Sequence, residues 1–247
     1  MGLIAAGITD IGMKRKTNQD AIYLNKQKRL FIVADGMGGH NGGDIASQMA
    51  VKTIPEYILE NYDTDPIKLQ KSGVLYANKS IKQHGENHKE LKGMGTTVVS
   101  QLFRGSHLYL ANVGDSRAYL INNKRLYQLT CDHSLVQEKL NIGLYTREQA
   151  CEDPQKNVLV RTVGYDSDVE VDLYTYKVHR NDIFLSCSDG LHGKVSDSDL
   201  CYVINHFIPS PANVTESRLN ECCNYLIELA NKNGGQDNIS VVIVVAQ

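Results

Sequence analysis

The sequence contains no run of about 18 or more apolar residues, which is the length that a transmembrane helix needs. Its first residues also lack the charged region and the long apolar core of a secretory signal peptide. Ala6 stands where an N-myristoylation signal carries Ser or Thr. These absences predict a cytoplasmic protein without a membrane partner.

The sequence also lacks cysteines at the spacing of a metal site and an excess of either positive or negative charge. The six cysteines form no C-x-x-C pair, which argues against a structural zinc site or a disulfide scaffold and for reduced thiols. The 26 basic and 28 acidic residues are well mixed and leave a net charge of -2. No face for nucleic acid or for a membrane surface is therefore indicated.

Internal repeats, low-complexity tracts and linkers are absent, and 42% of the residues are hydrophobic, enough for a sizeable core. We therefore predict a single domain over residues 1–247 and a monomeric protein. Apolar patterning predicts strands at residues 3–9, 21–24, 30–34, 96–103, 108–113, 117–121, 158–162, 169–178, 183–188 and 239–245, with 96–121 as a β-meander. Helical spacing predicts helices at residues 44–62 (interrupted by Pro55), 66–84, 134–153, 198–207 and 215–232. This order indicates an α+β fold with strands sandwiched between helical layers.

An apolar run at residues 30–34 delivers Asp35 into the glycine-rich turn Gly36-Met37-Gly38-Gly39-His40. Taken alone, Asp35-Gly36 is an ordinary strand-ending turn. Upstream, Asp20 opens a second strand-like run, and the polar residues 25–29 between the runs are typical of a hairpin. If the hairpin turns near residues 27–28, Asp20 and Asp35 lie opposite each other, where like charges destabilise a strand pair. Such a pair favours a bound cation, and oxygen ligands prefer Mg²⁺, Mn²⁺ or Ca²⁺ to zinc.

Asp189 and Asp237 repeat this arrangement, because Asp189 closes the strand at 183–188 and Asp237 precedes the strand at 239–245. If those strands are antiparallel neighbours, both carboxylates lie at the same sheet edge. Arg15, in the basic loop that leads to Asp20, lies near the predicted cation. Two divalent ions about 3.5–4 Å apart can hold and acidify a water, and arginine recognises phosphate oxygens. The chemistry indicated is hydrolysis of a phosphate ester.

Competing chemistries lack their motifs. No cysteine is followed by arginine at the spacing of a cysteine-nucleophile phosphatase, and there is no G-x-S-x-G elbow. Residues 36–43 lack the Lys-Ser/Thr ending of a P-loop and the last glycine of a dinucleotide fingerprint. Asp166-Ser167-Asp168 follows no apolar strand and is predicted to be a solvated turn instead of an aspartyl nucleophile. His84 and His88, four residues apart, fit a solvated helix end better than a metal pair.

The chain resembles the metal-dependent type 2C (PPM) protein serine/threonine phosphatases, in their compact bacterial form. The resemblance runs through nearly the whole chain in family order, in the blocks Arg15-x-x-Asn18-Gln19-Asp20, Ala34-Asp35-Gly36-Met37-Gly38-Gly39-His40, Gly95-Thr96-Thr97, Asn112-Val113-Gly114-Asp115-Ser116-Arg117, Asp132-His133-Ser134, residues 157–164, Ser188-Asp189-Gly190-Leu191 and Asp237-Asn238-Ile239-Ser240. Each block is weak alone, but the ordered set is specific. Some positions depart from the family's usual residues, namely Gln19 and Asp44 (Glu), Tyr145 (Ile) and Asn181 (Gly).

The resemblance implies two central antiparallel β-sheets between helix layers (αββα), with the insert at 134–153 as a small helical flap. It also implies a binuclear Mn²⁺ or Mg²⁺ centre and a third, weaker metal position. By the same resemblance, Asp35 bridges both metals, Asp20 and the Gly36 carbonyl serve one, Asp189 and Asp237 serve the other, Asp115 with Asp189 forms the third position, and Arg15 clamps the phosphate. The implied activity is hydrolysis of phosphoserine and phosphothreonine esters by metal-activated water, on phosphoproteins made by a serine/threonine kinase.

Two alternatives stay open at this point. His40 beside the glycine-rich turn either protonates the leaving serine or threonine oxygen or only packs against the turn. The chain is either a phosphatase or a catalytically silent relative that binds phosphoproteins or a regulatory partner. The intact Arg15 and carboxylates favour the enzyme, because a silent binder has no reason to keep a costly carboxylate cluster.

Overall fold

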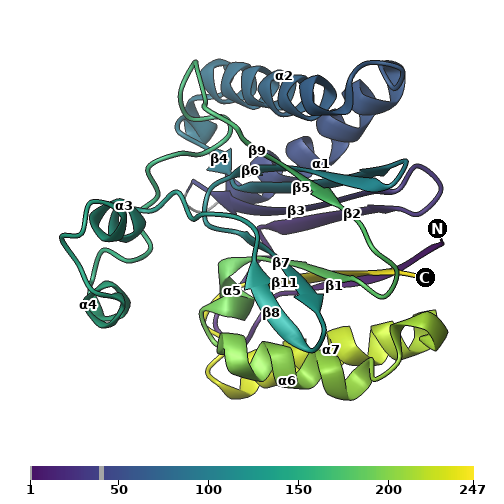
Figure 1. Ribbon diagram of the computed structural model, residues 1–247. Coiled ribbons are helices and arrows are strands. Elements are labelled where there is room, and N and C mark those ends of the chain that lie inside the picture. The colour runs from purple at the N-terminus through teal and green to yellow at the C-terminus, as the bar shows by residue number, and fades with distance from the viewer. Residues whose placement is uncertain (1, 39–41) are drawn as a thin grey trace.

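Two antiparallel β-sheets pack face to face at the centre of the fold (Figure 1). The computed structural model describes residues 2–38 and 42–247. The five-stranded sheet has the order β1 (Leu3–Asp10), β11 (Ile239–Ala246), β10 (Ile183–Cys187), β7 (Arg117–Asn122) and β8 (Arg125–Gln128). The six-stranded sheet has the order β2 (Asp20–Asn25), β3 (Leu30–Met37), β5 (Val98–Arg104), β6 (His107–Val113) and β9 (Asp172–Lys177), with β4 (Gly95–Thr96) paired to β3. The α+β sandwich expected from the sequence is confirmed.

Helices cover the outer face of each sheet (Figure 1). The six-stranded sheet is covered by α1 (Gly43–Glu60) and α2 (Pro66–Asn87), and the five-stranded sheet by α6 (Asp197–Phe207) and α7 (Glu216–Lys232). Short helical segments complete the chain, namely η1 (Lys89–Leu91), α5 (Asp189–His192) and η2 (Pro211–Asn213). The flap, residues 134–153, contains α3 (Leu135–Asn141) and α4 (Arg147–Glu152) and projects to one side of the sandwich (Figure 1).

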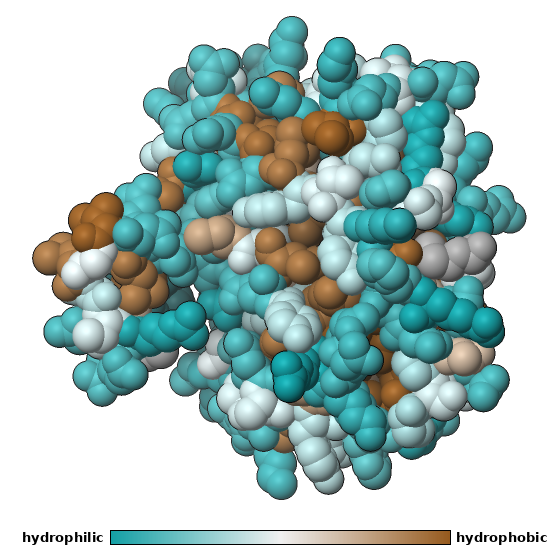
Figure 2. All heavy atoms as spheres, in the orientation of Figure 1, coloured by the Kyte–Doolittle hydropathy of each residue, from teal (hydrophilic) through white to brown (hydrophobic). Residues whose placement is uncertain are grey.

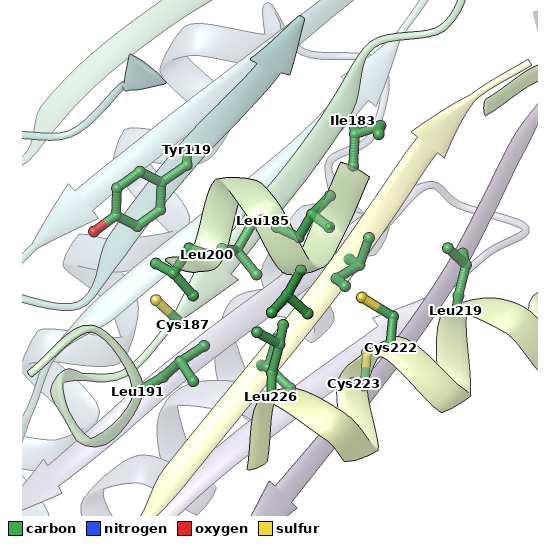
Figure 3. Close-up of a cluster of buried hydrophobic side chains, with 14 of the residues drawn as sticks. Tyr119, Ile183, Leu185, Cys187, Leu191, Leu200, Leu219, Cys222, Cys223 and Leu226 are labelled. Atoms are coloured by element: carbon green, nitrogen blue, oxygen red, sulfur yellow. The ribbon is translucent and has the colours of Figure 1, made fainter. Parts of the chain in front are cut away.

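The hydrophobic core has three layers, one between the sheets and one under each pair of helices. Strand β11 contributes to two of them, because Val242 and Val244 face the other sheet while Val241 and Ile243 face the helices. Burial on both faces explains the unbroken apolar run of this strand. Figure 3 shows the layer under α6 and α7, where Leu226 and its neighbours on α7 point toward the strands.

Helix α1 continues through Pro55, which corrects the interruption expected from the sequence. A proline inside a helix removes one backbone hydrogen bond and crowds the preceding turn, at a cost of about 3 kcal/mol. Ile54 and Ile58 on the same helix are fully buried in the layer shared with α2 and the six-stranded sheet. Each such side chain contributes roughly 1.5–3 kcal/mol on burial. The buried face therefore outweighs the defect.

The strands expected at residues 96–121 do not form one meander. Strands β5 and β6 pair in the six-stranded sheet, whereas β7 pairs with β10 in the other sheet. The chain changes sheets at Gly114, whose φ of 103° lies in the left-handed region that favours glycine. A Cβ at this position would lie 2.5 Å from Cγ2 of Thr97. The crossing places Asp115 where the two sheets meet.

Residues 158–162 form no strand, although their apolar pattern predicts one. Nearby pairing in the described chain is limited to the isolated bridges of Ser134 with Leu159 and of Thr96 with Val163. Val158 and Val160 are 45% and 37% exposed, so these apolar side chains do not join the core. It forms the stem by which the chain returns from the flap.

Candidate metal centre

The hairpin of β2 and β3 places Asp20 directly opposite Asp35, as expected from the sequence. The carboxyl group of Asp35 lies within hydrogen-bonding range of Asp20, and the Gly36 amide donates to the Gln19 carbonyl oxygen at 3.0 Å. The turn that follows is tightly packed, because a Cβ on Gly36 would lie 1.9 Å from the carbonyl oxygen of Gly43. The close approach of the two backbone segments at Gly36 therefore leaves no room for a side chain.

The second carboxylate pair also lies as expected. Strands β10 and β11 are antiparallel neighbours, so Asp189, which follows β10, lies beside the start of β11, where Asp237 precedes Ile239. Gly190 lets the two segments touch, because a Cβ there would lie 1.9 Å from the carbonyl oxygen of Asn238. Both carboxylates are partly exposed and lie at one edge of the sheet.

Serine hydroxyls join the two halves of the site. The Oγ atoms of Ser188 and Ser240 each donate to Oδ2 of Asp20 at 2.7 Å. The Gln19 amide donates to Oδ1 of Asn238 at 2.8 Å, which ties β2 to the loop before β11. The sequence patterns did not assign these residues a role. The available signal was a polar side chain at the end of a strand that is otherwise apolar.

Burial leaves this carboxylate cluster electrostatically frustrated. It raises the pKa of Asp20 to about 6 and, with the charge of Asp237, raises the pKa of Asp189 to about 6. The pKa of Asp35 is raised well above its usual range by burial and by the charges of Asp20, Asp189 and Asp115. Oδ1 of Asp20 and Oδ1 of Asp189 are buried and accept no hydrogen bond. Orphaned carboxylate oxygens in a ring of like charges fit a divalent cation, which neutralises the cluster and takes oxygen ligands.

Within residues 2–38 and 42–247, no three His, Cys, Asp or Glu side chains by themselves form a metal-holding group. Mg²⁺ usually keeps several waters and uses one or two carboxylates instead of an all-protein cage.

Asp115 extends the cluster from the loop between β6 and β7. Its side chain is buried, and burial together with the charges of Asp189 and Asp132 raises its pKa to about 8. His192 lies in α5, and its Nε2 is 3.0 Å from the carbonyl oxygen of Asp115. Burial lowers the pKa of His192 to about 4, so the neutral ring donates from Nε2 to this carbonyl.

Arg15 lies at the mouth of the cluster. Its NH2 group donates to Oδ2 of Asp237 at 2.7 Å, and its side chain is 49% exposed. This hydrogen bond raises the pKa of Arg15, and the charges of Asp35 and Asp189 act in the same direction. A fixed positive charge thus adjoins the carboxylates at the solvent side. His40 lies outside the described residues.

Two other sequence expectations concern groups away from the cluster. The rings of His84 and His88 stack at 4.3 Å at the end of α2, and Nδ1 of His88 is 2.9 Å from the carbonyl oxygen of His84. Asp166 and Asp168 are exposed in a turn. The structure thus keeps all four residues outside the carboxylate cluster.

Comparison with known proteins shows the family to which this chain belongs. The profile of the family described as "Protein phosphatase 2C" matches residues 13–227. The chain belongs to the protein phosphatase 2C family. It is 39% identical to the serine/threonine phosphatase stp of Listeria innocua over 244 residues, covering 96% of this chain and 93% of that protein. It is 36% identical to the protein phosphatase PhpP of Streptococcus pneumoniae over 243 residues, covering 96% and 95%.

Solved structures show the same fold. The crystal structure of the serine/threonine phosphatase PstP/Ppp of Mycobacterium tuberculosis superposes with a TM-score of 0.90 at 33% identity, covering 100% of both chains. A structure of the catalytic domain of PstP in complex with two manganese ions superposes with a TM-score of 0.86 at 33% identity, covering 98% of this chain and 97% of that chain. These likenesses agree with the family membership and with the αββα architecture.

Proposed function

We propose that this member of the protein phosphatase 2C family hydrolyses phosphoserine and phosphothreonine esters in proteins, with two bound Mn²⁺ or Mg²⁺ ions. The observation that carries the proposal is the carboxylate cluster at the junction of the two sheets, with its orphaned Asp20 and Asp189 oxygens beside Arg15. The manganese-bound structure of PstP supports the same cofactor here. When bound, two divalent ions acidify a water and neutralise charge on the phosphate.

The positions of the side chains support a division of labour. We assign Asp35 to both ions, Asp20 and the Gly36 carbonyl to one ion, and Asp189 and Asp237 to the other, with Asp115 at a weaker third position. Ser188 and Ser240 hold Asp20 through Oδ2 and so leave Oδ1 for the cation. The ion at Asp189 and Asp237 would then share Asp35 with the other sheet, so the binuclear site depends on the packing of the sandwich.

Arg15 recognises the phosphate group of the substrate. Its present partner is Oδ2 of Asp237, while Oδ1 of Asp237 accepts from the Asn238 amide at 2.9 Å. If Asp237 held a cation, the guanidinium of Arg15 would be free of this partner and could form two hydrogen bonds with phosphate oxygens. His40 remains our proposed proton donor to the leaving oxygen, with packing against the turn as the alternative role.

The flap is suited to contact the protein part of the substrate. Ile142 and Leu144, between α3 and α4, are 77% and 63% exposed. Figure 2 shows hydrophobic residues gathered on this projecting segment. Exposed apolar side chains next to an active site are suited to bind apolar residues of a phosphopeptide. We propose that the flap selects among phosphoprotein substrates and that residues 1–247 act as one phosphatase domain.

We also propose that the substrates are made by a serine/threonine kinase and that the protein acts as a monomer in the cytoplasm. The unbridged cysteines of the described chain, Cys131, Cys187, Cys201, Cys222 and Cys223, support a reducing compartment. Among the described residues, no helix is both long and apolar enough to cross a membrane.

Hydrolysis of p-nitrophenyl phosphate with and without added Mn²⁺ tests the proposed function. We expect activity that requires the metal, that Asp35→Asn abolishes and that Asp168→Asn retains. Asp168 is a matched control, because it is an exposed carboxylate remote from the cluster. Full activity in the presence of EDTA, or equal losses in the two variants, would reject the two-metal site. Metal binding without hydrolysis would favour the silent phosphoprotein-binding relative.

A further inference from the structure

His133 lies at the point where the flap leaves the sandwich, and its side chain is 6% exposed. The residue forms two reciprocal hydrogen bonds with Gly114. The His133 amide donates to the Gly114 carbonyl oxygen at 2.9 Å, and the Gly114 amide donates to Nδ1 of His133 at 3.1 Å. Gly114 immediately precedes Asp115. The side chain of His133 therefore fixes the start of the loop that carries this carboxylate.

The backbone of His133 also holds the returning stem of the flap. Its carbonyl oxygen accepts from the Val160 amide at 2.9 Å. One residue further, Ser134 forms a bridge with Leu159, and the Leu135 amide donates to the Val158 carbonyl oxygen at 2.9 Å. Both stems of the flap thus meet at His133. A single residue contacts the outgoing stem, the returning stem and the Asp115 loop.

The hydrogen bond from Gly114 determines the tautomer of His133. Because Nδ1 accepts a hydrogen bond, the ring proton of the neutral imidazole is on Nε2. Nε2 lies 3.2 Å from Oδ2 of Asp172, which is ion-paired with Arg161 and accepts from the hydroxyl of Tyr174. The Nε2 contact is close in distance but does not meet hydrogen-bond geometry. Nδ1 is therefore the better aligned anchor of the ring.

The Asp115 loop is held on both sides. Gly114 has little freedom to move, because its position lies against Thr97, and the Asp115 carbonyl oxygen accepts from Nε2 of His192 at 3.0 Å. The backbone that leads to Asp115 thus passes through the Gly114 amide, which donates to Nδ1 of His133. Contiguous hydrogen bonds therefore link the flap stems at His133 to the Asp115 loop.

We propose that His133 is a positioning residue that couples the flap to Asp115: Nδ1 sets the Asp115 loop, and the backbone of His133 holds both flap stems. The coupling to a cation rests on the proposed function, which assigns Asp115 to the weaker metal position. Coupling of two sites is reciprocal. A cation at Asp115 therefore stabilises the flap stems, and a displaced flap weakens that cation.

Two amide variants separate the roles of the two ring nitrogens. In His133→Asn the amide oxygen takes the place of Nδ1, whereas in His133→Gln the amide nitrogen takes the place of Nε2. Asp172→Asn serves as a control, because Asp172 faces only Nε2. The measurements are hydrogen exchange of the Gly114 and Val160 amides by NMR, with and without Mn²⁺, and calorimetric titration with Mn²⁺.

In His133→Gln we expect exchange at Gly114 to accelerate about 10-fold or more and Mn²⁺ binding at the weakest site to fall about 10-fold, the effect of losing one buried hydrogen bond. In His133→Asn and Asp172→Asn both quantities should stay within about 3-fold of the wild type. Mn²⁺ should slow exchange at Val160 in the wild type and in His133→Asn, but not in His133→Gln.

Equal behaviour of His133→Asn and His133→Gln, including an equal loss of thermal stability, would show a merely structural role and overturn the proposal. So would Val160 exchange in the wild type that does not respond to bound Mn²⁺. A wild-type protein that binds no Mn²⁺ at all would reject the proposed function and the coupling to a cation. In that case Gly114 exchange in the two variants still decides whether His133 positions the loop.

Discussion

Without divalent metal, the fold should become less stable as the pH rises, because burial raises the pKa of the site carboxylates. Asp20 has a folded-state pKa of about 6 against an ordinary value of 3.8. The folded, metal-free protein therefore binds more protons than the unfolded chain between these two values, and its free energy of unfolding falls as the pH rises through about 6. At about 1.4 kcal/mol per pKa unit, the loss at Asp20 alone is about 3 kcal/mol.

A chain of this size loses roughly 2–4 °C of melting temperature per kcal/mol. About 2 kcal/mol of this loss falls between pH 4.5 and pH 7.5, because the rest occurs below pH 4.5. We therefore expect the melting temperature in EDTA, measured by calorimetry or circular dichroism, to fall by roughly 4–8 °C over this range as a result of Asp20. Saturating Mn²⁺ should reverse the direction, because the cation favours the ionised carboxylates and binds more tightly as they lose protons.

Asp20→Asn isolates this contribution. The amide keeps an acceptor for the hydroxyls of Ser188 and Ser240 and removes the buried charge. In EDTA at pH 7.5 the variant should melt above the wild type, and added Mn²⁺ should stabilise it less. Asp168→Asn, an exposed carboxylate, should behave as the wild type does. If metal-free Asp20→Asn is less stable than the metal-free wild type at pH 7.5, the carboxylate cluster is not electrostatically frustrated and the reasoning is wrong.

Three further predictions concern activity. Asp35→Asn and Asp189→Asn should each lower turnover by orders of magnitude with unchanged circular dichroism, since the carboxylate charge that balances the metals is lost. Asp115→Ala should leave the metal affinity of the binuclear centre near normal. Unfolding of all three variants to the same extent would indicate a structural role. Trimming the flap, residues 134–153, should raise KM for phosphopeptides far more than for p-nitrophenyl phosphate, and a proportional loss on both would place the flap in the chemical machinery. His40→Ala should slow phosphothreonine peptides about 100-fold and p-nitrophenyl phosphate much less, because phenolate leaves without a proton; equal losses would assign His40 to the architecture of the turn.

Features that depend on neighbouring residues could be predicted from the sequence. The polar residues 25–29 between two apolar runs predicted the hairpin that sets Asp20 against Asp35, and the structure has that register. The helix predicted from residue 66 does begin at Pro66, and the side chain of Asp65 before it accepts hydrogen bonds from the amides of Ile67 and Lys68 at 3.1 Å. Local chemistry decides such turns and caps, so the sequence contains the necessary information.

Features that depend on distant partners could not be predicted in this way. The apolar residues 158–162 have strand-like character but no neighbouring strand, and Pro55 stays inside a helix because the buried face of α1 packs well. The supporting roles of Ser188 and Ser240 were also missed, since their shared acceptor on Asp20 is 168 and 220 residues away along the chain. Pairing and packing over such separations follow from the whole fold.

The sequence by itself determined most of the strands and helices and the carboxylates that end or precede strands, because alternation, capping and turn chemistry act over a few residues. Only the tertiary structure decided that the chain changes sheets at Gly114 and so brings Asp115 to the cluster. It also decided that His133 joins the flap stems to that loop. The reason is physical: these contacts join segments far apart in the chain, and their energies depend on burial and alignment that exist only once both sheets have packed together.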